Sequence, residues 1–511
     1  MSKLFNHMKN KYHLNGILAM FLGILFANFM GYAQQPALQY FRYYDQRGVN
    51  VFEPSKNDTV GFNGLKVRIG ASFSQGFQML DHSNNAKALL TGTGMPALIE
   101  TAPGSGSFVN VSTGAAVEGI TQHPTIYGGY LTADNKVYMN GNQLYDIAGG
   151  FPLAQANLNL DVQLADGVRV SLVSYMSSHH HNEFWVKGGY FQIDKVGFLN
   201  SEFMDKLWQN LTLKVGHMEI NYGDAHFRRN DGGNTMYNPF IENNLMDAFN
   251  TEIGGELYWQ KSGVIAMVGI TDGEIQGSVT KPNDRKPSFY GKLGYDKVYG
   301  EKLRFRLTGS VYSTKSSISN TIYGGDRTGS NYQFVMEPYN ATVTANAFSG
   351  RINPGFKDNV TSFMINPFVK FAGIEFFGTY EVGKGNSQVE NGEIQNAASD
   401  LTKLEERQFN QYEADIVYRF GQREKFYIGA KYNKIDGTLS LGQSTTAPNI
   451  NQGVRDDVSV DRTSFAAGWY ITKNVMFKAE YVTQNYKGYP EEHILSGGKF
   501  DGFVIQGAIG F

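Results

Sequence analysis

The stretch F-D-G-F-V-I-Q-G-A-I-G-F, residues 500–511, decides the fold. Phe503, Ile505, Ile509 and Phe511 share one parity, which only Gly507 interrupts. Because successive side chains of a strand point to opposite faces, this pattern predicts a strand with one apolar face suited to lipid. Such a strand requires a series of similar strands upstream and an export signal at the start of the chain.

The first residues have the layout of a secretory signal peptide. Lys3, Lys9 and Lys11 precede an apolar stretch from 16 to 30, and Gly-Tyr-Ala at 31–33 is a small-x-small cleavage site. We therefore expect residues 1–33 to be cleaved. The alternative is a membrane anchor, for which the apolar core is short. The chain has no cysteine, which excludes disulfides and lipid attachment through a cysteine.

The composition favours strands over membrane helices. Beyond residue 30 no run of about 18 apolar residues occurs, so helical spans are excluded. Aromatic residues make up 14% of the 511 residues and glycine contributes 59, which suits tilted strands, tight turns and interfacial aromatic belts. The net charge of −2 gives no reason to expect nucleic-acid binding. No pattern calls for a cofactor.

Alternating patterns predict an all-β protein, a transmembrane antiparallel up-and-down β-barrel within residues 61–511. A barrel of eighteen strands is an alternative prediction, because residues 78–154 contain strand-like pieces near 107–120 and 125–139. These pieces could join the wall or fold above the rim of a sixteen-strand barrel. The sixteen predicted strands are 64–77, 155–166, 167–178, 184–194, 209–220, 249–260, 263–272, 287–298, 302–314, 360–372, 373–385, 410–421, 424–437, 461–472, 474–486 and 500–511.

Short and long connections alternate along this series. Turns such as Asp166-Gly167 and Ala372-Gly373 are short, whereas 221–248 and 386–409 are long. Outer-membrane barrels have short periplasmic turns and long extracellular loops, so both chain ends are expected on the periplasmic side. Residues 195–208 are long for a periplasmic turn, and a helical turn is expected at 202–208.

The polar parity of each strand is expected to face inward. A charge near the membrane midplane costs about 2–4 kcal/mol for Arg or Lys, so the apolar parity must face lipid. A barrel of this size is too wide for its own side chains to fill, and the inward charges are expected to line a water-filled lumen. The candidate pore-lining residues are Lys66, Arg68, Arg169, Lys214, Glu252, Glu256, Arg304, Arg306, Glu413 and Arg419.

The long loop 221–248 follows the fifth predicted strand and is rich in turn formers and charges. In this layout the chain resembles the sixteen-stranded bacterial porins, including the phosphate-selective porin family. The segment K-V-G-H-M-E-I at 214–220 is similar to the K-V-G-Q-F segment of that family. The resemblance implies that the loop folds inward and narrows the pore; the alternative is a solvated outer loop. The candidate constriction residues are Asp224, His226, Arg228, Arg229, Asp231 and Glu242.

The same resemblance carries further expectations. A homotrimer in the cell outer membrane is implied. Phe511 is similar to the terminal aromatic residue of the closing strand, which the barrel-assembly machinery recognises. Basic and acidic inward residues are nearly matched, however, so no continuous arginine ladder for phosphate is evident.

Other functions have weaker support in the sequence. The run His179–His181 could bind a transition metal, but surface histidine runs are more often incidental, so a metal site is not expected. No G-x-S-x-G elbow occurs, and an enzyme is not expected. Residues 34–60 precede the first strand and could plug the barrel, pack on its rim, contact a partner or form a disordered tail.

The sequence thus predicts an outer-membrane porin for passive diffusion of small hydrophilic solutes or ions through a water-filled barrel narrowed by loop 221–248. Two alternatives remain. One is a barrel with a closed lumen that serves a secretion or surface complex, and the other is a substrate-specific channel.

Overall fold

The computed structural model describes residues 35–511, except for 93–94, 103–104, 112, 123–128, 134, 178–183, 231, 274–285, 301, 316–319, 326, 358, 388–389, 391–403 and 441–454. The predicted signal peptide, the histidine run His179–His181 and Asp231 lie outside the described residues. No helix among the described residues is long and apolar enough to cross a membrane.

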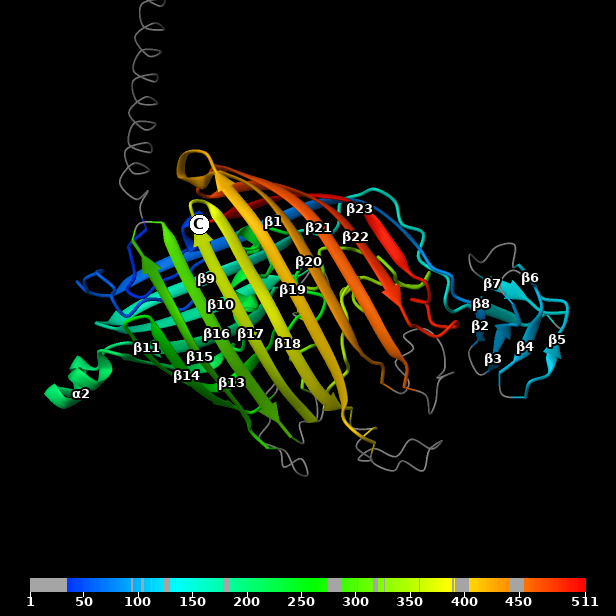
Figure 1. The fold of residues 1–511 in the computed structure, drawn as a ribbon, viewed down its shortest axis with the longest axis horizontal. Coiled ribbons are helices and arrows are strands. Elements are labelled where there is room, and N and C mark those ends of the chain that lie inside the picture. The colour runs from blue at the N-terminus through cyan, green and yellow to red at the C-terminus, as the bar shows by residue number, and fades with distance from the viewer. Residues whose placement is uncertain are drawn as a thin grey trace, which may run out of the picture.

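Sixteen antiparallel strands close into a barrel, in which β1 pairs with β23 on one side and with β9 on the other (Figure 1). The prediction of sixteen strands is confirmed. The barrel strands are β1 (Lys66–Ser83), β9 (Gln155–Ala165), β10 (Val168–Met176), β11 (Trp185–Ile193), β12 (Leu211–Glu219), β13 (Thr251–Lys261), β14 (Val264–Thr271), β15 (Ser288–Tyr299), β16 (Leu303–Thr314), β17 (Asn359–Phe371), β18 (Ile374–Asn386), β19 (Arg407–Phe420), β20 (Phe426–Thr438), β21 (Asp457–Thr472), β22 (Val475–Lys487) and β23 (Lys499–Gly510).

The strand-like pieces between β1 and β9 form a separate sheet of seven strands in the order β5-β4-β3-β2-β8-β7-β6. Figure 1 shows this sheet standing beside the barrel rather than in its wall. The eighteen-strand alternative is therefore wrong, because these pieces are too short to span a bilayer and pair only with one another. The strands are β2 (Leu89–Gly92), β3 (Met95–Glu100), β4 (Phe108–Asn110), β5 (Ala116–Val117), β6 (Thr121–Gln122), β7 (Gly129–Leu131) and β8 (Val137–Asn140).

Side-chain exposure follows the predicted parity. In β23, Phe503 and Ile505 are each 53% exposed, whereas Val504 and Ala508 are each 2% exposed. The expected outward residues of β16, such as Leu307 and Val311, are likewise exposed. A closed barrel pairs every strand edge, and an outward apolar surface of this kind is the form in which strands can span a bilayer.

The barrel has two unlike ends, which we call the short-turn end and the long-loop end. At the short-turn end Gly373 has φ +88°, and a Cβ there would lie 2.4 Å from the carbonyl oxygen of Arg419, so the turn requires glycine. The backbone N–H of Gln46 donates to the Lys473 carbonyl at 2.9 Å, and that of Phe511 donates to Ala71 at 3.0 Å. Residues 35–60 and Phe511 thus lie at the short-turn end.

The expected helical turn at 202–208 is confirmed as α2, between β11 and β12. Its Ser201 side chain accepts a hydrogen bond from the backbone N–H of Met204 and caps the helix. The helical elements are η1 (Gln46–Gly48), η2 (Gly197–Leu199), α2 (Glu202–Trp208), η3 (Ala225–Arg228), η4 (Thr235–Tyr237) and η5 (Gln422–Glu424), of which all but α2 are 3₁₀ turns.

Candidate functional site

The candidate site is the interior of the barrel, where three segments lie against the inner wall. They are residues 35–60, the loop 220–250 and the loop between β16 and β17, described from 320 with gaps. The loop 220–250 is buried almost throughout, so it is not a solvated outer loop. The lumen therefore holds folded chain in addition to wall side chains. This differs from the simple water-filled lumen expected from barrel width alone.

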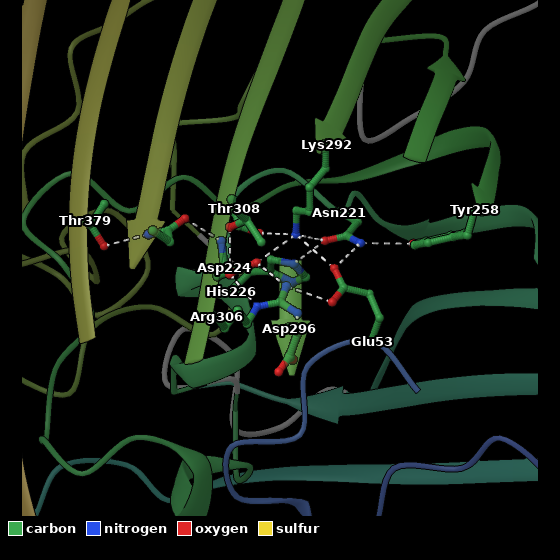
Figure 2. Close-up of polar contacts among 12 residues, drawn as sticks. Glu53, Asn221, Asp224, His226, Tyr258, Lys292, Asp296, Arg306, Thr308 and Thr379 are labelled. Atoms are coloured by element: carbon green, nitrogen blue, oxygen red, sulfur yellow. Dashed lines mark hydrogen bonds and ion pairs between the residues drawn. The ribbon is translucent and has the colours of Figure 1, made fainter. Parts of the chain in front are cut away.

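An ionic cluster joins two of these segments to the wall. Arg306 on β16 donates two hydrogen bonds of 2.7 Å to Asp224 of the inner loop, through Nε and Nη2, and its Nη2 also lies 2.7 Å from Glu53. Lys292 on β15 lies 3.0 Å from Asp224 and 3.2 Å from Glu53. Figure 2 shows Glu53 reaching the two cations from the N-terminal segment. The cluster holds the loop and residues 35–60 to the same patch of wall.

Neutral groups complete the hydrogen bonding of this cluster. The Thr308 hydroxyl donates to Asp224 at 2.7 Å, and the Asp224 backbone N–H donates to Asn366 at 2.8 Å. The Asn221 amide donates to Glu53 at 3.0 Å. Buried charges are tolerated when paired and fully hydrogen-bonded, and this cluster meets that condition for Asp224.

Both inner carboxylates are held in their charged form. Burial alone raises the pKa of Glu53, but Arg306 and Lys292 outweigh it and hold that pKa well below its usual value. Burial also raises the pKa of Asp224, but Arg306 and Lys292 outweigh that effect, so the pKa of Asp224 is lowered.

A second contact ties the same segments to a neighbouring part of the wall. Arg228 donates two hydrogen bonds of 3.0 and 3.1 Å to Asp415 on β19 and one of 2.6 Å to Asn50. The Asn50 amide in turn donates to Glu375 on β18 at 2.5 Å. Arg228 thus pairs directly with one wall carboxylate, and Asn50 of the N-terminal segment connects it to a second.

The other candidate constriction residues contact the loops themselves more than the wall. Arg229 pairs with Asp247 of its own loop at 2.6 Å, and His226 Nδ1 lies 2.5 Å from Glu219 at the end of β12. Glu242 accepts hydrogen bonds from the Ser330 hydroxyl and the Asn331 backbone N–H, at 2.7 Å for the latter. The structure therefore brings five of the six candidates into the lumen, and the sixth, Asp231, is not described.

The ten candidate pore-lining residues all point inward, and none is exposed on the outer face. Their partners are of several kinds. Arg304 and Arg306 pair within the wall with Asp296, at 2.6 and 3.1 Å, and Arg419 pairs with Glu375 at 2.9 Å. The rest contact inner segments, neutral groups or more distant charges: Lys66, Arg68, Arg169, Lys214, Glu252, Glu256 and Glu413.

Most of the wall packs against the inner loops through apolar groups. One buried cluster joins Ile241 and Leu245 of the loop 220–250 to side chains of β13–β17, β19–β23 and β1. A second joins Met236 and Phe240 to β19–β23. Among the described residues, β9–β12 contribute no side chain to either cluster. The inner loops fill much of this part of the interior, and we call it the packed side.

The inner face of β9–β12 instead borders a cavity of about 1280 Å³, including the space where it joins solvent. We call this part of the interior the open side. Basic side chains outnumber acidic ones on its lining. The charged lining residues are Arg42, Arg169, Lys187, Lys214 and Arg229 against Asp161 and Glu219, with His217 and His226 beside them. Only Arg169 and Lys214 of the ten candidate pore-lining residues border it.

Sequence reasoning missed the residues of the N-terminal segment that enter the site. Arg42 stacks over the Tyr237 ring at 3.8 Å, and Glu53 joins the ionic cluster. Aromatic and charged residues are dense in the run Q-Y-F-R-Y-Y-D-Q-R at 39–47, which is unlike a disordered tail and is the pattern that could have pointed to them. No group of three or more potential metal ligands occurs among the described residues.

Comparison with solved structures finds bacterial outer-membrane channels. They include the outer-membrane channel DcaP of Acinetobacter baumannii, with 10% identity and TM-score 0.43 over 88% of this chain and 98% of that one. An anion-selective porin from Comamonas acidovorans has 9% identity and TM-score 0.41, covering 88% and 100%. OmpT of Vibrio cholerae has 10% identity and TM-score 0.40, covering 88% and 99%.

No family model and no curated protein matches the sequence. At these identities and TM-scores we draw no conclusion from the likeness, and the architecture rests on the topology described above, a closed, sixteen-stranded antiparallel barrel.

Proposed function

We propose that this protein is an outer-membrane channel for passive diffusion of small hydrophilic solutes. In this proposal the short-turn end faces the periplasm, and residues 35–60 act as a plug that, with loop 221–248, narrows the lumen. The observation that carries it is the cavity on the open side, whose lining includes seven charged side chains, next to a part of the lumen that packed loops fill. A barrel that served only as a scaffold would not require a cavity lined by charged side chains.

The charges of that lining support a preference for anions. Five Lys and Arg side chains, of which Arg229 is paired with Asp247, face two carboxylates in a confined space with low-dielectric walls, and the remaining excess of basic groups focuses a positive potential. Basic and acidic residues are nearly balanced over the whole chain, so the composition does not reveal this local excess of basic groups. Most other inward acids are paired or hydrogen-bonded on the packed side. The selectivity we propose is one of charge sign, without a single specific solute.

The test is single-channel conductance of the refolded protein in a planar bilayer, with the reversal potential measured in a salt gradient. We expect stable, small conductance steps and a reversal potential of the sign given by anion preference. Steps that occur in threes would support the expected homotrimer. A folded barrel with no conductance would contradict the proposal.

The closed-lumen alternative has two observations in its favour. The inner loops fill the packed side, and the seven-stranded sheet of β2–β8 stands outside the barrel with its own small core of Leu90, Leu98, Phe108 and Tyr138. If the sheet is the functional part, a variant in which a short linker replaces residues 88–141 loses partner binding, and the intact protein shows no conductance. If the channel is the functional part, this variant conducts as the intact protein does.

A further inference from the structure

The connection between β11 and β12 exposes an unusual amount of apolar surface for a turn. Phe198, Leu199, Phe203 and Leu207 are 58%, 48%, 73% and 45% exposed, and no residue of η2 or α2 is buried. Figure 1 shows α2 standing away from the barrel at the short-turn end. Contiguous exposed apolar groups of this kind mark a surface that meets another apolar phase.

The helix is amphipathic despite its seven residues. At 3.6 residues per turn, the apolar side chains of Phe203, Met204, Leu207 and Trp208 fall on one half of the helix, and the three charged residues fall on the other. On the charged half, Lys206 and Glu202 form an ion pair of 2.6 Å. The Trp208 indole N–H donates to the Ile193 carbonyl at 3.2 Å, which fixes the helix to the end of β11.

The chain that follows α2 enters the barrel wall at an exposed aromatic residue. Leu211, three residues after α2, pairs with Trp259 at the short-turn end of β13. Other exposed aromatic side chains lie where strands meet the short turns, including Phe420 of β19 and Trp469 of β21. A ring of such residues at one end of a barrel is the pattern of a membrane interface. Tyr299 and Phe371 belong to the same ring.

We propose that residues 197–208 form an interfacial anchor, which lies in the lipid headgroup region of the leaflet at the short-turn end. The proposal rests on the membrane barrel of the proposed function, but not on conduction. The charges near the helix, Lys195, Glu202, Asp205 and Lys206, sum to zero, so attraction to anionic lipid is not required. The partner is therefore a neutral lipid surface, met through apolar contact.

The absence of cysteine from the chain makes a direct test possible. A spin label on Phe203→Cys, in the full-length barrel in phosphatidylcholine vesicles, reports collision with oxygen, which concentrates in lipid, and with a nickel chelate, which stays in water. We expect oxygen to dominate at 203 and the chelate to dominate at the control Glu202→Cys, on the charged half of the same turn. The preference at 203 should persist at high salt.

Three outcomes would overturn the anchor. Chelate collision at 203 as frequent as at 202 would place the helix in water. Protection of 203 from both reagents would place it against a second copy of the chain. A label on Phe503→Cys, in the barrel wall, provides the control for insertion: if it meets the chelate rather than oxygen, both the anchor and the membrane barrel are wrong. If the label at 203 collides with oxygen but the folded barrel shows no conductance, the interfacial anchor is supported and the channel function is contradicted.

Discussion

The packed side and the open side of the barrel share one wall architecture but have different interiors. Behind β9, the inward residues are Gln155, Asn157, Asn159, Asp161 and Gln163, and water-compatible groups face the cavity. Behind β22, the inward parity combines Met476, Val482 and Tyr486 with Lys478, Glu480 and Gln484, and these side chains contact the inner loops or neighbouring strands. Strand alternation specifies the wall, whereas contact with the inner loops determines whether the lumen behind it is filled or open.

The largest effect is expected from removing the N-terminal segment. Deletion of residues 36–60 from the mature chain should raise single-channel conductance several-fold, because this segment covers the short-turn end and borders the cavity through Phe41, Arg42 and Tyr44. Bilayer recordings measure the change. Unchanged conductance from a folded barrel would mean that solutes do not pass along the open side, and the contrast between the two sides would lose its functional meaning.

Breaking the ionic cluster should destabilise the protein strongly. Arg306→Ala leaves Asp224 and Glu53 buried with one cation fewer, and loss of one partner from a buried ion pair costs about 3–5 kcal/mol. Arg304→Ala is the matched control on the same strand, because Arg304 is partly exposed and should cost less. Denaturant unfolding in micelles compares the two variants. Equal losses of stability would show that the cluster does not secure the inner segments.

Reversal of one cavity charge should change ion selectivity without changing the fold. Lys214 borders the cavity, and its Nζ lies 3.4 Å from the Tyr258 hydroxyl. We expect Lys214→Glu to shift the reversal potential toward cations. The control Lys434→Glu makes the same charge change on the outer parity of β20, where Lys434 is opposite the exposed Tyr412. Equal shifts for both variants would mean that the cavity is not the conduction path.

The smallest effect is expected from acid. The lowered pKa of Glu53 means that its carboxylate stabilises docking above the usual glutamate pKa of about 4.3, and that this contribution is lost only as pH falls toward the lower folded value. Conductance should therefore stay constant down to about pH 5 and rise in stronger acid as the segment detaches. Glu53→Gln should conduct more than the parent at neutral pH and respond less to acid. A conductance change at mildly acidic pH would assign the titration to another group.

The wall of this molecule was predictable from local sequence, because period-two alternation and turn residues are local properties. Even so, β1 runs to Ser83, six residues past its predicted end at 77, since the long-loop end of a strand need not stop at the membrane. The inner segments were less predictable. Asp224 and Arg228 were identified by their place in a long charged loop, but Glu53, which shares Arg306 with Asp224, and Asn50, which binds Arg228, are over 150 residues away in sequence. No local pattern encodes such pairings.

The closure of β1 against β23 also has a consequence for the order of assembly. The segment that precedes β1 touches turns and strands made hundreds of residues later: Gln46 contacts Lys473, and Asn50 contacts Glu375. Contacts of such long sequence separation form late, because each requires a large loop to close first. Residues 35–60 can therefore dock fully only when the wall is nearly complete, and their docking marks the finished barrel.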